Sequence, residues 1–328
     1  MKFLTLHTTT RQTNNHIINN IMSIKYESRT LEWTIIPSIC NTSNHRIADG
    51  EAGSGKLKDI SIQEYRHLTS LTNKDRWVCD YPDPSGTITI ELSVSICIML
   101  EKASKIGYLT GDRPKLFQEE LYEFGSYISS FMPANGKYFI RLNEASPKDC
   151  KYGCGPMTKA SEIVTALCTS LRAHRNFTSA RHSNVKETLY LVPWRDDWNK
   201  YLEFRVFVNE RRVTCLSQYI WHQYLGLSHS MIQIVSPRII EYCNNIAAKH
   251  SLPSFVIDVI VVVKDPVMVP DMKIPVIDET TEYNIELVEL NPFSAELSSG
   301  SALFHWLNDY DIMYGIDKSN VVVRYVVE

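Results

Sequence analysis

Apolar residues recur along the chain with the periods of both helices and strands. Between 116 and 132 they recur every three or four positions, which is typical of an amphipathic helix. In a second predicted helix Thr158 fits the N-cap, and in a third Ser236 and Pro237 fit a cap followed by proline in the first turn. The helices predicted in this way span residues 116–132, 158–172, 237–249 and 301–308.

Short apolar runs of strand length dominate the second half of the chain. The predicted strands span residues 138–142, 187–193, 202–208, 212–219, 255–263 and 283–290. The runs at 202–208 and 212–219 are close enough to pair as a hairpin. Helices and strands mixed in this way predict an α+β fold. We expect residues 1–30 to be a loosely ordered tail, 31–189 a small N-terminal lobe and 190–328 a C-terminal lobe.

Composition narrows the class of protein. The chain has 328 residues, of which 44% are hydrophobic and 22% charged, so it has enough apolar material for a folded core. Its 34 basic and 37 acidic residues give no basic excess, which argues against a dedicated nucleic-acid surface. No run approaches the ~20 consecutive apolar residues of a membrane span. We therefore expect a cytoplasmic protein with no membrane segment.

One glycine-rich segment has the spacing of a phosphate-binding loop. Gly50–Lys56 reads GEAGSGK, but Leu57 stands where such a loop needs a hydroxyl for magnesium, and the residues before it do not form a buried strand. We expect a surface loop with no role in nucleotide binding.

Two arginines lie where strands are predicted. Arg141 falls in the run at 138–142 and is followed by a turn that contains Lys148, an arrangement that can hold phosphate oxygens. The alternative is a surface turn with an arginine that extends into solvent. Arg205 shares a strand face with Glu203, so a structural Glu–Arg pair is the alternative there.

Three oxygen-bearing side chains lie on the last two predicted strands. Asp258 is surrounded by apolar residues, and an ionised carboxylate there is costly unless it is paired or bound to a metal. Glu289 and Asn291 are two residues apart and so point the same way. If the strands are neighbours, the three converge as ligands suited to Mg²⁺ and a nucleotide. Without metal, the two carboxylates would be like charges held close together.

Specific motifs follow one another between residues 115 and 310. They are FIRLNEASPKD from Phe139, EFRVFV from Glu203 with SQY shortly after it at residues 217–219, FVIDVI from Phe255, LVELNPF from Leu287 and SALFHW from Ser301. In this order and spacing the chain resembles the cell division cycle protein 123 family, a divergent branch of the ATP-grasp superfamily. The resemblance implies a two-lobed ATP-grasp-like fold whose antiparallel sheets clamp Mg–ATP.

The resemblance also implies which residues bind the ligands. The nucleotide-binding positions would be Arg141, Ala145, Ser146, Lys148, Asp149, Leu191, Val192, Trp194, Arg205, Asp258 and Asn291. The metal ligands would be Asp258, Glu289 and Asn291, with Glu289 where the family often has aspartate. The hinge that reads adenine contains Pro193, which has no backbone N–H, so Arg195 is the candidate to compensate.

Two functions of different classes follow from the resemblance. The first is an ATP-binding assembly chaperone for translation initiation factor 2, which docks the gamma subunit of that factor or another protein. The alternative is an ATP-dependent ligase that activates a carboxylate as an acyl phosphate, or another ATP-driven modification of a protein or RNA. A scaffold that binds no nucleotide is a third possibility. Since ATP binding and ATP cleavage need the same cations and metal ligands, the residues do not separate these functions, and they identify no catalytic group.

Overall fold

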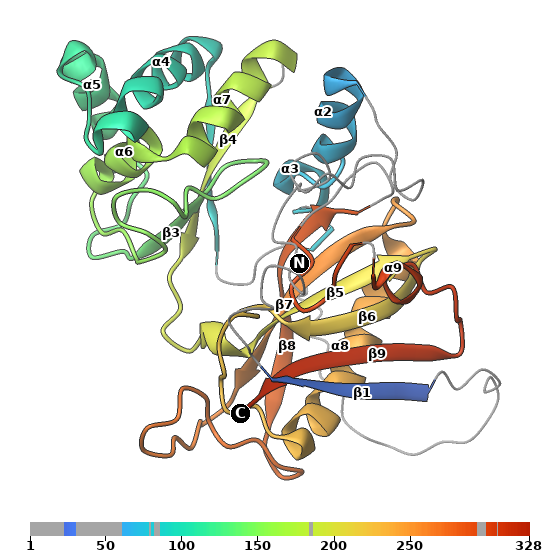
Figure 1. Cartoon of the computed structure of the whole chain (residues 1–328). Coiled ribbons are helices and arrows are strands. Elements are labelled where there is room, and N and C mark those ends of the chain that lie inside the picture. Colours follow the sequence, from blue (N-terminus) through green and yellow to red (C-terminus); the bar gives the residue numbers. More distant parts are fainter. Residues whose placement is uncertain are drawn as a thin grey trace, which may run out of the picture.

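The strands form two separate sheets, and helices pack against both of them (Figure 1). The computed structural model describes residues 23–30, 61–78, 80–81, 86–183, 186–293, 300–306 and 308–328. In that part of the chain the helices are α2 (Ile62–Ser70), α3 (Lys74–Trp77), α4 (Val94–Thr110), α5 (Gln118–Ser129), α6 (Ala160–Thr169), α7 (Leu171–Ser183), α8 (His229–Lys249) and α9 (Tyr310–Met313). The strands are β1 (Ser23–Thr30), β2 (Ile88–Leu92), β3 (Tyr138–Arg141), β4 (Glu187–Pro193), β5 (Glu203–Asn209), β6 (Arg212–Gln218), β7 (Phe255–Val263), β8 (Tyr283–Pro292) and β9 (Asn320–Val327).

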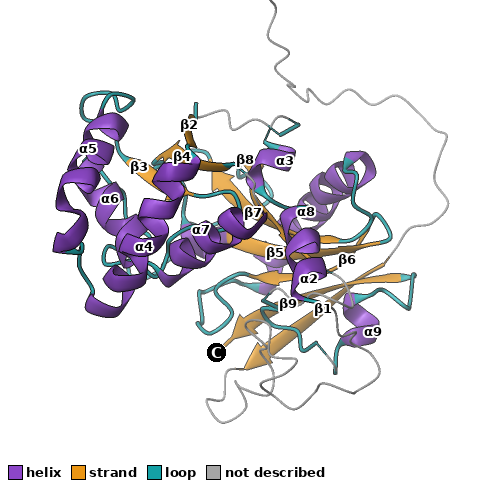
Figure 2. Ribbon diagram, turned by 90° about the horizontal axis from the view of Figure 1, so that it is seen from above, coloured by secondary structure: helices purple, strands orange, loops and turns teal. Residues whose placement is uncertain are grey.

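The small lobe, residues 86–193, is built on an antiparallel sheet with the strand order β2-β4-β3. Helices α4 to α7 gather around this sheet, apart from the larger one (Figure 2). Their apolar faces share one buried core with the strands, which includes Leu100, Leu121, Ile163, Leu167 and Phe177. The helix predicted at 116–132 is confirmed as the turn Lys115–Phe117 followed by α5.

The large lobe, residues 194–328 together with β1, is built on a sheet with the strand order β1-β9-β6-β5-β7-β8. Strands β5 to β8 pair antiparallel as predicted, but β9 pairs parallel with both β1 and β6, so the sheet is mixed. The apolar face of α8 packs on one side of it, where Ile232, Val235 and Ile239 join a core with Phe204 and Ile257. The α+β class is therefore confirmed.

Three sequence predictions about helix ends are wrong. The predicted helix 158–172 is two helices, because Ser170 is extended (φ −101°, ψ 126°) and its hydroxyl accepts a hydrogen bond from the N–H of Ala173 to begin α7. Helix α8 begins after its cap Ser228 and not at Pro237, which lies inside the helix. Residues 301–306 form turns, and the short helix comes later, at α9.

The predicted N-terminal tail contains a strand. Residues 1–22 and the glycine-rich segment Gly50–Lys56 lie outside the described residues. Ser23–Thr30, however, form β1, which lies beside β9 over its whole length (Figure 1). Glu27 on β1 pairs with Arg324 on β9 at 2.8 Å, which anchors the edge strand. None of the helices in the described part is long and apolar enough to cross a membrane.

The segment α2–α3 contacts both lobes. Trp77 is buried in the core of the large lobe, although the sequence assigned its segment to the small one. Three residues earlier, the backbone N–H of Lys74 donates to the carbonyl of Asn143 in the small lobe at 3.0 Å, and the Lys74 ammonium lies 5.4 Å from the ring of Tyr190. Tyr81 then donates to the Ile246 carbonyl of α8 at 3.4 Å. This segment therefore holds the two lobes together.

Helix α4 approaches the end of α6 so closely that only glycine fits at one position. A Cβ atom on Gly107 would lie 2.3 Å from the carbonyl oxygen of Cys168, whereas one on Gly125 of α5 would meet the Val164 side chain at an ordinary 3.6 Å. Both glycines are inside helices, where alanine is intrinsically favoured by roughly 0.5–1 kcal/mol.

We predict that the matched substitutions Gly107→Ala and Gly125→Ala change stability in opposite directions. Gly107→Ala lowers the free energy of unfolding by about 1–3 kcal/mol, because the helices must separate to admit the methyl group. Gly125→Ala raises it slightly. Urea denaturation followed by circular dichroism measures both, and equal effects of the two substitutions would contradict the close approach.

Candidate functional site

Strands β5, β7 and β8 bring polar side chains together in an otherwise apolar sheet. Asp258 on β7 is paired in register with Arg205 on one side and with Glu289 on the other. Directly paired residues of neighbouring strands point to the same face. The three side chains therefore share one face of the sheet, opposite the one covered by α8. The condition stated from the sequence, that these two strands are neighbours, is therefore met.

Arg205 and Asp258 form a buried bidentate ion pair. The guanidinium Nε and Nη2 atoms lie 2.8 and 2.7 Å from the two carboxylate oxygens, and Nη1 donates to the Gly300 carbonyl at 2.6 Å. Asp258 is fully buried and Arg205 is 8% exposed. An arginine cannot lose its charge, so its burial requires an anion at this place.

A second ion pair crosses between the lobes. Arg141, the last residue of β3, pairs with Glu289 of β8, and both side chains are buried. The side-chain amide of Asn291 donates to Asp258 at 2.9 Å and to Glu289 at 3.3 Å, which joins the two ion pairs. Burial opposes ionisation of Glu289, but Lys148 and Arg141 outweigh it and hold its pKa well below the usual range. The predicted metal ligands thus lie together and are neutralised by arginines.

Lys148 brings a third cation to this cluster. Its ammonium lies 5.5 Å from the centre of the Tyr219 ring, and the Arg205 guanidinium lies 5.0 Å from the same ring. Burial disfavours the charged form of Lys148, but Glu289 together with Tyr219, Glu203 and Asp258 outweighs burial and raises the pKa of the ammonium. Within the described part of the chain, Lys148 forms no ion pair closer than 4 Å, so its hydrogen-bonding capacity is available to a ligand.

Glu203 and Tyr219 belong to the cluster although the sequence did not assign them to a binding site. The alternation along β5 already put Glu203 on the face of Arg205, which was the available signal. Burial raises the pKa of Glu203 to about 8; Lys148 opposes this shift, and Asp258 and Glu289 add to it. One carboxyl oxygen of Glu203 is buried without a hydrogen-bond partner. Tyr219 directly follows β6 and ends the SQY run of the motif series, which was the available signal.

The predicted binding residues in the turn after β3 differ in burial and in hydrogen bonding. The hydroxyl of Ser146 and the Nε atom of Arg141 are buried without a hydrogen-bond partner. The Ala145 carbonyl accepts from the N–H of Leu142 at 3.0 Å and closes the turn. Asp149 is exposed.

The Asp149 carboxylate caps the start of α7. It accepts hydrogen bonds from the Ser170 hydroxyl and from the backbone of Leu171 and Arg172. Asp149 therefore stabilises a helix end and is not seen to join the ion pairs.

Three of the four predicted hinge residues lie at the end of β4, and Trp194 follows it. Leu191 is buried in the sheet opposite Ile88, the first residue of β2, so Val192 and Pro193 extend beyond β2. The backbone N–H of Trp194 donates to the Lys137 carbonyl at 2.8 Å and is already used. Arg195 pairs with Glu286 of β8 and with Asp197, both at 2.5 Å, and so fastens the hinge to the large lobe.

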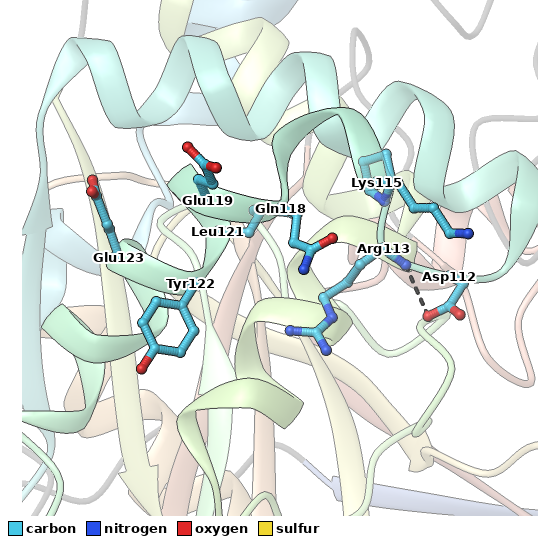
Figure 3. A pocket seen from close by; sticks show the side chains of 9 residues that line it. Asp112, Arg113, Lys115, Gln118, Glu119, Leu121, Tyr122 and Glu123 are labelled. Atoms are coloured by element: carbon cyan, nitrogen blue, oxygen red, sulfur yellow. Dashed lines mark hydrogen bonds between the residues drawn. The ribbon is translucent and has the colours of Figure 1, made fainter.

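Two cavities in the described residues lie away from this cluster. One, of about 550 Å³, is lined by charged residues of both signs between Asp112 and Glu123 on the outside of the small lobe (Figure 3). The other, of about 750 Å³, lies beside the loop between β7 and β8. In the parts of the chain that are described, no three His, Cys, Asp or Glu side chains are arranged as a metal site. The candidate ligand set of Asp258, Glu289 and Asn291 is not such a group, because its third member is a carboxamide.

A small antiparallel sheet and a large mixed sheet that meet over buried ion pairs define an α+β protein with a polar site between two lobes. The family model described as D123 matches residues 110–327. The chain belongs to this family, that of cell division cycle protein 123.

Solved structures of this family have a similar fold. Cdc123 from Schizosaccharomyces pombe is 15% identical, with a TM-score of 0.57 over 83% of this chain and 100% of that chain. C-terminally truncated Cdc123 from the same organism is 16% identical, with a TM-score of 0.57 over 80% of this chain and 98% of that chain. At these identities the likeness shows the fold alone. A search of curated proteins finds no match.

We predict that Glu203 makes the ligand-free protein less stable as the pH rises from 5 to 8. The pKa of Glu203 is about 8 in the folded protein, against 4.5 for the ordinary carboxyl. The folded state therefore keeps a proton that the unfolded chain releases, and this contribution is complete below the lower value and is lost as the pH passes the higher one.

The variant Glu203→Gln separates this effect from other titrations. Relative to the variant, the parent should lose up to about 1.4 kcal/mol per pH unit across this range. Urea denaturation at half-unit pH intervals gives both curves. Parallel curves for parent and variant would show that Glu203 ionises normally.

Proposed function

We propose that this protein binds Mg–ATP between its two lobes, in the manner of an ATP-grasp fold, and acts as an assembly chaperone for translation initiation factor 2. The observation that carries the proposal is the cluster of cations where β3 of the small sheet lies beside β8 of the large sheet. Arg141 comes from the small lobe, Lys148 from the turn that follows, and Arg205 from the large lobe. A ligand that contacts all three must lie between the lobes.

The charges of the cluster favour an anionic ligand. Arg141, Lys148 and Arg205 face two carboxylates in ion-pair geometry, Asp258 and Glu289. Since the pKa of Glu203 is about 8, that carboxyl is mostly neutral at pH 7. One buried positive charge is left uncompensated, and polyphosphate oxygens are its natural partners. The unpartnered Ser146 hydroxyl can add a hydrogen bond.

Asp258, Glu289 and Asn291 fit a magnesium ion by the chemistry of their donors. Mg²⁺ takes one or two carboxylates together with phosphate oxygens and water. The arginines that neutralise the carboxylates would then turn to the phosphates, and Asn291 would present its oxygen in place of its N–H. Magnesium would supply charge neutralisation at the phosphates. The exposed edge of Val192 and Pro193 beyond β2 is the place for the adenine ring.

We predict that Lys148→Met weakens Mg–ATP binding at least tenfold, equivalent to about 1.4 kcal/mol, and leaves the fold intact. Methionine keeps the apolar stem and removes only the charge. Isothermal titration calorimetry measures the dissociation constant. Lys186→Met is the matched control, because Lys186 forms only an exposed pair with Glu91. Equal affinity of parent and Lys148→Met, or no ATP binding by the folded parent, would refute the proposal.

Turnover separates the chaperone from a ligase. A chaperone that uses bound ATP should release ADP or AMP only slowly when it is alone, whereas a ligase should turn over when its carboxylate and amine or thiol substrates are supplied. We predict tight binding with negligible turnover of the purified protein, and a defined complex with the gamma subunit of translation initiation factor 2. Sustained nucleotide release without that partner would favour the ligase.

A further inference from the structure

The loop between β7 and β8 exposes a concentrated set of apolar side chains. Over residues 264–282 the exposed fractions are 68% for Val267, 51% for Met268, 40% for Val269, 38% for Met272 and 43% for Val276. Isolated exposed apolar residues are common on soluble proteins, but a contiguous set marks an interaction surface. The loop projects from the large lobe (Figure 1).

This loop is held in place by its own hydrogen bonds and by two anchors. The N–H of Val276 donates to the Val267 carbonyl at 2.9 Å, and Met268 and Pro275 form an antiparallel bridge. Ile274 and Ile277, only 1% and 5% exposed, insert into the core of the large lobe. These contacts fix the loop on the large lobe, and the five apolar side chains stay exposed. A surface ordered in advance loses little entropy when it binds a partner.

The loop that carries these apolar residues is acidic. The loop contains five carboxylates and two lysines. Lys264 pairs with Glu282 at 3.0 Å, and Lys273 donates to the Gln223 side chain at 3.2 Å, so both lysines are engaged. The remaining acids, Asp265, Asp271, Asp278 and Glu279, are exposed on the same loop.

A cavity at the base of the loop extends this acidic surface. It has a volume of about 750 Å³, and Asp278, Glu279 and Glu282 line it together with Arg238 and Lys264. Arg238 is stacked on the ring of Tyr283 at 4.7 Å. A lysine or arginine side chain of a partner could enter this cavity and meet the carboxylates.

We propose that this loop docks a segment of another protein in which apolar side chains are combined with lysine or arginine. The acids complement such a segment and repel the anionic surface of a membrane. They also repel a second copy of the same acidic loop. The loop lies roughly 20 Å along β7 from Asp258, at about 3.3 Å per residue. Docking is therefore independent of the proposed nucleotide site.

Two synthetic peptides of about 18 residues test the proposal as defined probes. Both are amphipathic helices with the same leucine face, and the polar face carries lysines in one and glutamates in the other. Fluorescence anisotropy measures their dissociation constants. The leucine–lysine peptide should bind the parent at least tenfold more tightly than the leucine–glutamate peptide. The triple variant Val267→Ser, Met268→Ser, Val269→Ser should lose at least tenfold of that affinity.

Matched variants assign the effect to the loop. Ile316→Ser changes a side chain that is 64% exposed elsewhere on the large lobe, so it should leave binding unchanged. The double variant Asp271→Asn, Glu279→Gln should weaken binding and reduce its salt dependence. All variants should keep the circular dichroism spectrum and Mg–ATP affinity of the parent, since the changes are at the surface.

Other outcomes overturn the proposal. Binding of both peptides with equal affinity, unchanged binding by the triple variant, or no binding to the parent up to about millimolar concentration each contradicts it. Self-association of the parent that the triple variant abolishes, seen by sedimentation velocity, assigns the loop to a dimer instead. Binding to phosphatidylcholine vesicles that the triple variant abolishes assigns it to a membrane.

Discussion

The buried ion pair of Arg205 and Asp258 is the constraint on which the site depends. Neither charge is stable alone in the middle of an apolar sheet, and removing one partner of such a pair costs about 3–5 kcal/mol. Register then brings Glu289 beside Asp258, and Glu289 requires a further cation, which Arg141 provides from the other sheet. The buried carboxylate of β8 therefore requires that β3 of the small lobe lie beside the large sheet.

Strand periodicity predicted much of the site from sequence. The positions of Arg205, Asp258, Glu289 and Asn291 follow from apolar runs interrupted by charge, and these residues do lie together. The sequence led us to expect two carboxylates close together, and the structure adds an arginine partner for each of them. The pairing of Arg141 with Glu289 depends on how the small lobe packs against the large one. The periodicity of apolar residues along one strand carries no information about that contact.

Other differences have local causes that sequence periodicity does not reveal. The polar strand β1 reads as a tail because its hydrogen-bonding partner, β9, is almost the whole chain away. Pro237 suggested a helix start, yet a proline can lie inside a long helix when packing on the sheet offsets the lost hydrogen bond, as in α8. Asp149, which the resemblance implies as a nucleotide-binding residue, caps α7 in the structure, and the sequence pattern gave no sign of that contact.

The segment α2–α3 gives the N-terminal part of the chain a hold on both lobes. Lobe separation must break the Lys74–Asn143 backbone hydrogen bond together with the Arg141–Glu289 pair, because both connect the same two bodies. Residues 61–81 lie before the stretch that matches the family model. Substitutions in this segment can therefore change how readily the two lobes separate without altering any residue of the matched stretch.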